Sequence, residues 1–171
     1  MTATVEAGAG AVWDVAAAVP DPELPMVTLA DLGILRSVTR DGDAVTVTIT
    51  PTYSGCPAMT EMSADLRSRL QRAGYADVTV RTSLAPAWSS DWITPAGRAK
   101  LAAAGIAPPN AAARRPAGPI PLTLRARPRV VACPRCGSTD SRETSAFSAT
   151  ACKALYRCDA CDEPFEYVKE I

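Results

Sequence analysis

The chain has 171 residues, of which 47% are hydrophobic, and its 18 basic and 18 acidic residues give a formal net charge of zero. This length suits one medium domain or two small ones, and no apolar run reaches the length of a membrane span, so we expect no membrane partner. The sequence contains no histidine, which excludes a histidine base and histidine metal ligands. Any metal must therefore be held by cysteine thiolates or carboxylates.

The first hundred residues predict a compact α+β domain with the order α-β-β-α-β-α. Apolar periodicity and turn residues place its elements as follows: a helix over 8–19, strands over 34–40 and 44–51, a helix over 57–72, a strand over 76–84 and a helix over 94–106. The turn Asp41-Gly42-Asp43 joins the first two strands as a β-hairpin. Thr94 is the expected N-cap of the last helix.

Two of these elements carry a clear pattern of burial. Val45, Val47 and Ile49 alternate with threonines, so we expect the second strand to have one buried face. The second helix presents an apolar stripe at helical spacing. Its members are Met59, Met62, Leu66, Leu70 and Ala73.

The chain is expected to divide into a domain over 1–106, a linker over 107–129 and a second domain over 130–171. The linker contains six prolines and five arginines and shows no periodicity. Such a segment is typical of an extended, solvated spacer. A basic docking arm for an acidic partner is the alternative.

The last 39 residues contain five of the six cysteines. Cys133 and Cys136 form one C-x2-C pair, and Cys158 and Cys161 form another. Paired knuckles at this spacing, with short predicted strands between and after them, indicate a β zinc ribbon. So small a module has little core, so one structural metal would supply much of its folding free energy.

Zinc is the expected ion, although four thiolates of this kind also bind iron in rubredoxin-like sites. Cys152 is the odd cysteine of this region. It is either a small buried residue or an additional ligand beside the ribbon.

Cys56 stands alone in the segment 50–66, TPTYSGCPAMTEMSADL. With Pro57 at the predicted first helical position, its thiol would meet unpaired N–H groups and the positive end of the helix dipole. Both stabilise a thiolate, which favours a soft-metal ligand or a nucleophile. A small buried residue is the equally open alternative.

Four separated motifs resemble the SufT-like family of iron–sulfur assembly factors. They are an Asp-Pro-Glu-x-Pro loop at 21–25, an Asp-Leu-Gly turn at 31–33, a Thr-x-x-x-Cys-Pro loop at 52–57 and a Pro-x-Trp segment at 86–88. With the ribbon added, the whole chain is similar to the phenylacetate-degradation D family (PaaD), accessory subunits of the ring-1,2-phenylacetyl-CoA epoxidase. The resemblance implies that Cys56 is the functional thiol and that Asp31 is its neighbour.

The resemblance implies a role in phenylacetate catabolism. The epoxidase is a multicomponent monooxygenase with a di-iron oxygenase subunit and an iron–sulfur, flavin-containing reductase. A non-catalytic subunit of this kind would contact the oxygenase or the reductase and assist maturation of their iron or iron–sulfur centres. Cys56 and Asp31 would hold a transient cluster or iron, with a homodimer as one way to share it.

Two other functions compete with this one. Iron in the four-cysteine site would make the chain an electron-transfer component. The second competing function is a zinc-ribbon interaction module that binds nucleic acid through the arginine-rich linker. The acidic balance of both flanks argues against nucleic acid. Because the N-terminus lacks a basic region and Asp14 interrupts its apolar run, we expect a cytoplasmic protein.

Overall fold

The computed structural model describes residues 4–5, 10–110 and 129–170. The chain forms two compact units, which divide between Ala104 and Gly105. Unit 1 precedes this point and unit 2 follows it, and each is described by itself. No helix of the described residues is long and apolar enough to cross a lipid bilayer.

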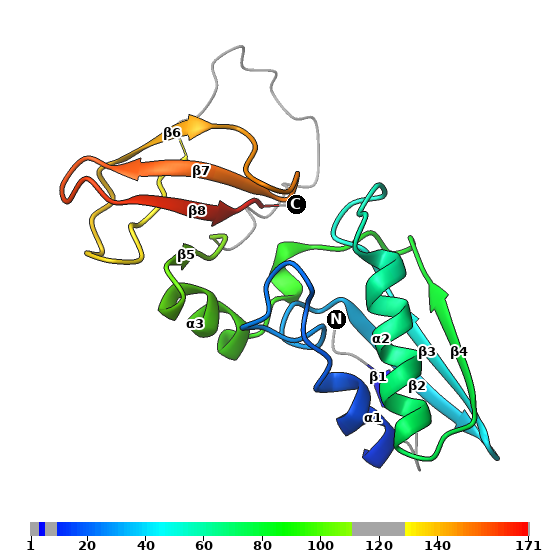
Figure 1. The fold of residues 1–171 in the computed structure, drawn as a ribbon. Coiled ribbons are helices and arrows are strands. Elements are labelled where there is room, and N and C mark those ends of the chain that lie inside the picture. Colours follow the sequence, from blue (N-terminus) through cyan, green and yellow to red (C-terminus); the bar gives the residue numbers. More distant parts are fainter. Residues whose placement is uncertain (1–3, 6–9, 111–128, 171) are drawn as a thin grey trace, which may run out of the picture. The chain divides into compact units, whose positions relative to one another are not determined.

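Unit 1 has the predicted α+β architecture (Figure 1). Its strands and helices are, in chain order, β1 (Thr4–Val5), α1 (Gly10–Ala17), β2 (Leu35–Asp41), β3 (Ala44–Ile49), α2 (Met59–Arg72), β4 (Asp77–Thr82), the 3-10 helix η1 (Ser90–Trp92) and α3 (Pro95–Ala103). All six predicted elements are present. The short β1 and η1 were not predicted.

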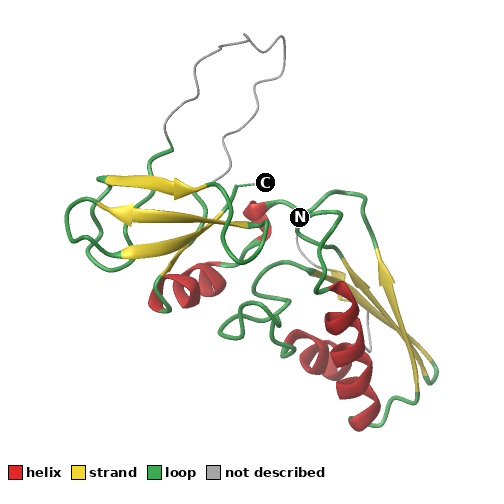
Figure 2. Ribbon diagram, turned by 45° about the horizontal axis from the view of Figure 1, so that its top comes forward, coloured by secondary structure: helices red, strands yellow, loops and turns green. Residues whose placement is uncertain are grey.

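The sheet of unit 1 has the order β1-β2-β3-β4. β2 and β3 form the predicted antiparallel hairpin, and its turn has Gly42 at a φ of +57°, where side chains are disfavoured. β4 returns parallel to β3 after α2. Helices α1 and α2 cover one face of the sheet, as Figure 2 shows.

The core of unit 1 lies between this face and the two helices. Val45, Val47 and Ile49 are buried as predicted. The α2 stripe is confirmed at Met62, Leu66 and Leu70, whereas Met59 is half-buried and Ala73 is exposed. Met59 is the first residue of α2 and Ala73 is its C-cap, so both lie at the helix ends.

Unit 2 is a small β sheet of order β5-β8-β7-β6. Its strands are β5 (Ile106–Ala107), β6 (Ser141–Ser145), β7 (Lys153–Cys158) and β8 (Pro164–Val168). The ring of Tyr156 packs against those of Phe165 and Tyr167, with centroid distances of 5.9 and 5.4 Å. These aromatic rings supply much of the small core.

The predicted linker over 107–129 falls mostly outside the described residues, from 111 to 128. Its first residue, Ala107, belongs to β5, which pairs in parallel with β8. At the other end of the segment, the backbone carbonyl of Val130 accepts a hydrogen bond of 2.9 Å from Asn110 Nδ2. Both ends of the segment thus attach to unit 2.

Candidate functional site

The four cysteines of the two C-x2-C pairs come together in unit 2. The Sγ atoms of Cys133, Cys136, Cys158 and Cys161 all lie within 4.8 Å of one another. Cys133 Sγ lies 3.8 Å from Cys161 Sγ, and Cys136 Sγ lies 3.6 Å from Cys158 Sγ. Thiolates about 2.3 Å from one tetrahedral zinc would lie about 3.8 Å apart, so these residues fit the ion.

Backbone hydrogen bonds shape both knuckles. In the first, the Gly137 N–H donates to Cys133 O and the Cys133 N–H donates to Ser138 O. Gly137 has a φ of +76°, which allows the chain to turn there. In the second, the Cys158 N–H donates to Glu163 O at 2.9 Å. The predicted knuckle geometry is therefore present.

The thiols of Cys158 and Cys161 differ in their tendency to ionise. Burial opposes ionisation of Cys158, but the N–H groups of Cys161 and Ala160 donate to its sulfur, and together these effects lower the pKa of Cys158 to about 7. At Cys161 the Glu163 N–H favours the thiolate, yet the neighbouring sulfurs and burial outweigh it and raise the pKa to about 12. Several thiolates at this spacing therefore require a cation between them. The cluster is a metal-binding site.

Cys152 lies outside this group of four. Its half-buried sulfur is 3.1 Å from Thr150 Oγ1, and its carbonyl accepts from the Lys169 N–H. Its surroundings are thus those of a residue built into the end of the sheet.

Cys56 lies in unit 1, in a loop that precedes α2. Its thiol is half-buried, and its N–H donates to Tyr53 O. The prediction that the helix begins at Pro57 is wrong by two residues, because α2 begins at Met59. Met62 N–H makes the first intrahelical bond, to Ala58 O, which leaves Cys56 outside the first turn and weakens the helix-dipole argument for its reactivity.

A groove of about 280 Å³ lies beside this loop. Its walls are the preceding residues 50–54 and, from a second loop, Leu84, Ala87 and Trp88. Residues of both the Thr-x-x-x-Cys-Pro segment and the Pro-x-Trp segment thus line the groove. Trp88 lies 32 positions after Cys56 in the sequence.

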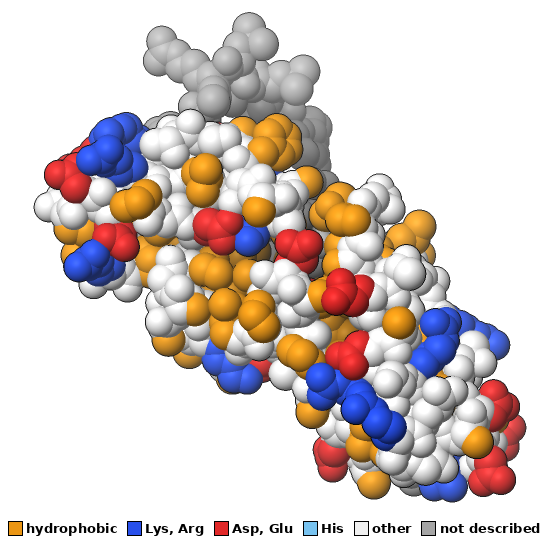
Figure 3. Space-filling view, viewed as in Figure 1, with side chains coloured by type: hydrophobic (Ala, Val, Ile, Leu, Met, Phe, Trp, Pro, Cys, Tyr) orange, Lys and Arg blue, Asp and Glu red, His pale blue; other side chains and the backbone are white. Residues whose placement is uncertain are grey.

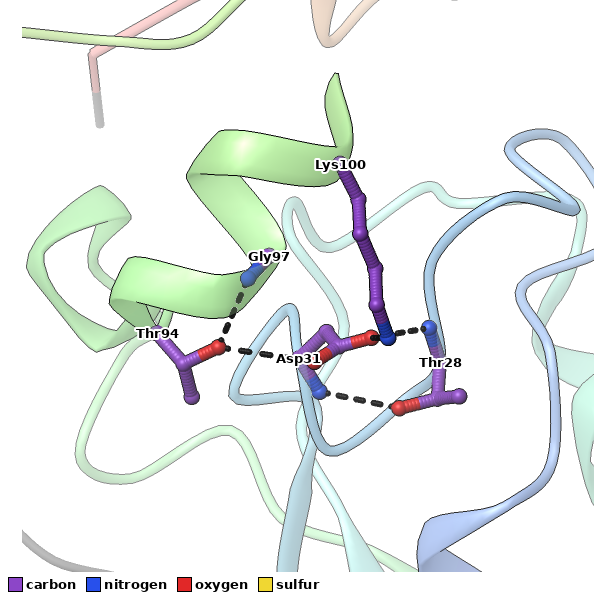
Figure 4. A network of polar contacts seen from close by, with 5 residues as sticks. All are labelled: Thr28, Asp31, Thr94, Gly97 and Lys100. Carbon is purple, nitrogen blue, oxygen red and sulfur yellow. Dashed lines mark hydrogen bonds and ion pairs between the residues drawn. The ribbon is translucent and has the colours of Figure 1, made fainter. Parts of the chain in front are cut away.

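Asp31 occupies a network of polar contacts at the start of α3 (Figure 4). Its Oδ2 accepts from the Thr28 N–H at 3.0 Å and from Lys100 Nζ at 2.6 Å. Its Oδ1 lies 3.5 Å from Thr94 Oγ1. Both carboxylate oxygens therefore have protein partners. The Thr94 hydroxyl also accepts from the Gly97 N–H at 2.9 Å, which confirms the predicted N-cap.

Residues 88–100 hold the whole Asp-Leu-Gly turn in place. The Thr94 N–H donates to Asp31 O at 2.8 Å, and Trp88 Nε1 donates to Leu32 O at 2.9 Å. Gly33 has a φ of +68°, and a Cβ there would lie 2.5 Å from Trp92 Cβ. The turn and the segment that follows β4 therefore form one structural unit, which we call the turn clamp.

Sequence reasoning missed most of the turn clamp. The motifs mark Asp31 and the Pro-x-Trp segment separately, and no motif includes Lys100. Lys100 is 69 positions from Asp31, and no local pattern reports a contact over that separation. The Gly97 position held a weak signal, since a helix interior disfavours glycine unless something approaches closely.

Acidification is expected to weaken unit 1 through Asp31. Burial raises the pKa of this carboxyl, but Lys100 and the Thr28 N–H lower it by more. The pKa of Asp31 in the folded protein therefore lies below its ordinary value of 3.8. A lowered pKa stabilises the fold at pH values above the unfolded-state pKa, and this contribution is lost as the pH falls through the folded value. We expect Asp31→Asn to destabilise unit 1 by about 1 kcal/mol at neutral pH and by progressively less below pH ~4.

Urea unfolding of wild type and Asp31→Asn between about pH 7 and about pH 2.5 measures this difference. Asp43→Asn, an exposed change in the hairpin turn, is the matched control and should change little at any pH. A constant gap between wild type and Asp31→Asn across the range would contradict the assignment.

The chain also matches known families. Residues 10–81 match the family described as iron-sulfur cluster assembly protein, and residues 117–169 match the PaaD zinc beta ribbon domain. A crystal structure of a domain of unknown function (DUF59) from Bacillus anthracis covers 53% of this chain and 88% of its own, with a TM-score of 0.50 and 26% identity. Fold and site thus define an iron–sulfur assembly-type domain joined to a four-cysteine zinc ribbon.

One relative covers both parts. It is the D subunit of the Escherichia coli (strain K12) enzyme named "Putative 1,2-phenylacetyl-CoA epoxidase", and it is 42% identical over 158 residues, which are 92% of this chain and 90% of that protein. The chain belongs to this family of epoxidase D subunits. A Porphyromonas gingivalis (strain ATCC BAA-308 / W83) protein named "Fe-S protein maturation auxiliary factor" is 34% identical over 76 residues, covering 43% of this chain and 71% of that protein.

Proposed function

We propose that this chain is a non-catalytic accessory subunit of a phenylacetyl-CoA epoxidase that assists maturation of iron or iron–sulfur centres in the oxygenase or the reductase. The observation that carries the proposal is the relative named as an epoxidase component, whose similarity extends through both units. The assembly-family match to residues 10–81 supports the maturation role. In this proposal the protein is cytoplasmic, and the iron or cluster is its cargo.

Each candidate residue has a stated role in this proposal. Cys133, Cys136, Cys158 and Cys161 hold one structural zinc, which stabilises unit 2 and leaves no open coordination position for chemistry. Cys56 is the transfer thiol, since it is the half-buried cysteine of unit 1 and follows the loop residues 50–54 that line the groove. Asp31 is a positioning residue, because both of its carboxylate oxygens already contact protein groups.

Electron transfer is the second candidate function. The spacing of the four sulfurs also suits iron, because a tetrahedral tetrathiolate site accepts either ion. The two candidates differ in colour and redox activity. Iron at this site absorbs visible light and changes oxidation state, whereas zinc does neither.

We expect Cys56→Ala to abolish binding of iron or a cluster to unit 1. The experiment is metal analysis with an absorption spectrum, on full-length protein purified anaerobically and then incubated with ferrous iron and sulfide. Wild type should contain about one zinc per chain and gain a visible chromophore. Cys56→Ala should keep the zinc and lack the chromophore.

Cys152→Ala is the matched control, since it also removes a half-buried cysteine outside the four-thiol group. It should behave as wild type. Iron retained in unit 2 of all three proteins, with a rubredoxin-like spectrum, would overturn the maturation proposal and favour electron transfer. A chromophore that survives in Cys56→Ala would remove the transfer role of this thiol.

A further inference from the structure

β4 is an edge strand of the sheet in unit 1. It lies at the end of the order β1-β2-β3-β4, and Figure 1 shows it at the outer side of the sheet. No described residue pairs with its outer side. β4 is six residues long, contains no proline or lysine, and pairs with β3 without a bulge. Proline, bulges and charged side chains commonly prevent an exposed edge from pairing with another chain. Of these three, β4 has only charged side chains, Asp77 and Arg81.

The direction of the backbone groups follows from one hydrogen bond. Ser83 N–H donates to Ile49 O at 2.9 Å, and Thr82 is the Cα partner of Ile49. Because alternate residues of a parallel strand face the same neighbour, Thr79 and Arg81 bond to β3 in the same way as Ser83. Val78, Val80 and Thr82 therefore turn their N–H and C=O groups outward.

An antiparallel copy of β4 meets these outward groups in a self-complementary register. Placing Thr79 opposite the Thr79 of a second copy sets each Val78 opposite a Val80, so the outward N–H and C=O groups of the two strands bond in pairs. The same register sets each Asp77 opposite an Arg81, in the non-hydrogen-bonded position where side chains approach most closely. Registers shifted by two residues place Thr79, instead of the opposite charge, across from Asp77 or Arg81.

The side chains agree with this arrangement. Asp77 and Arg81 are exposed, and neither forms an ion pair within the described part of the chain. On the other face, Val78 and Val80 are half-buried. They are the outermost members of cross-strand rows whose inner members, Val45 and Val47, are buried to 1% and 0% exposure. A second sheet would continue both rows and cover the two valines.

We infer that β4 is a homodimer interface, at which two copies of this chain join their sheets antiparallel across a two-fold axis through Thr79. Two Asp77–Arg81 pairs and two Val78–Val80 pairs specify the register. The space-filling view in Figure 3 shows basic and acidic side chains lying near one another on the surface of unit 1. The inference concerns the self-association of the chain and does not depend on the proposed function.

Charge reversal tests the register directly. Full-length wild type is expected to sediment at twice its 17.9 kDa mass at about 0.1 mM. Asp77→Arg and Arg81→Asp each put two like charges opposite each other at both of the 77–81 pairs in the dimer. Each variant should therefore raise the dimer dissociation constant at least about tenfold. The double variant Asp77→Arg/Arg81→Asp should restore the dimer. A mixture of the two single variants should form mixed dimers, since each then supplies the charge that the other lacks.

Amide hydrogen exchange gives a readout that does not depend on any variant. The amides of Val78, Val80 and Thr82 should become more protected as the wild-type concentration rises, while those of Thr79 and Arg81 stay protected by β3 throughout. A wild type that remains monomeric at about 0.1 mM, or a dimer that both charge reversals leave intact, would overturn the inference. So would exchange at Val78 and Val80 that does not change with concentration.

Discussion

Replacing Cys158 with serine is expected to unfold unit 2 and release its metal. Eight buried residues form the core of this unit, and two of them, Cys133 and Cys158, are metal ligands. Metal binding in small domains of this kind contributes apparent free energies of about 10–16 kcal/mol. That exceeds what a core of eight residues supplies after the entropy cost of ordering the chain, so loss of one ligand removes the folded state.

Two measurements follow the loss. Metal content should fall from about one ion per chain to about none, and the near-ultraviolet circular dichroism of the packed Tyr156 and Tyr167 rings should disappear. Cys152→Ser is the matched control, because it makes the same atomic change at a half-buried sulfur outside the cluster. Equal metal loss in Cys152→Ser would contradict the four-ligand assignment. Retention of the tyrosine signal in metal-free Cys158→Ser would contradict the claim that metal stabilises the unit.

Replacing Gly33 with alanine is expected to destabilise unit 1 more than Asp31→Asn does. The new Cβ would lie 2.5 Å from Trp92 Cβ and 2.7 Å from Trp92 O. The contact involves backbone, so it cannot be relieved by rotating a flexible side chain. Overpacking of this kind costs about 1–3 kcal/mol, and a side chain at positive φ adds about 1–2 kcal/mol.

Gly42→Ala separates the two contributions. Gly42 also has a positive φ, +57°, but a Cβ there would meet no atom within 4 Å. Gly42→Ala should therefore lower the free energy of unfolding only by the cost of a side chain at positive φ, about 1–2 kcal/mol. Urea unfolding of unit 1, followed through its tryptophans, measures both variants. Equal losses of unfolding free energy in Gly33→Ala and Gly42→Ala would show that the turn clamp can shift to accommodate the extra atom.

The sequence predicted the class of fold and the regular elements well, because both depend on local periodicity. Val45, Val47 and Ile49 alternate, and Met62, Leu66 and Leu70 recur at helical spacing, so each pattern reports one buried face. The four-cysteine cluster was also predictable, since two C-x2-C knuckles allow few geometries other than one shared metal.

Contacts between distant segments could not be predicted in this way. β1 and β5 have only two residues each, which is too short for any period to appear. Lys100 pairs with Asp31, and Trp88 bonds to Leu32. These partners are chosen by the folded arrangement of elements, and a single sequence holds no pattern for them.

The start of α2 decides whether the helix can activate the Cys56 thiol. Its predicted activation depended on a helix that begins at the next residue. Since α2 begins at Met59, the thiol lies beyond the first-turn N–H groups that would stabilise a thiolate. Its proposed role depends instead on its place within residues 10–81, which match the assembly family, and on its half-buried thiol after the groove-lining residues 50–54.

The pairing of β5 with β8 has a consequence for how this chain can vary. Because Ala107 and Val131 both belong to the core of unit 2, the proline- and arginine-rich residues between them form an insertion within one domain. The two units are instead connected directly at Ala104 and Gly105. Lengthening such an insertion costs only the slowly growing entropy of loop closure, about 0.6 kcal/mol for each doubling. Relatives can therefore gain or lose residues there without changing the connection between the two units.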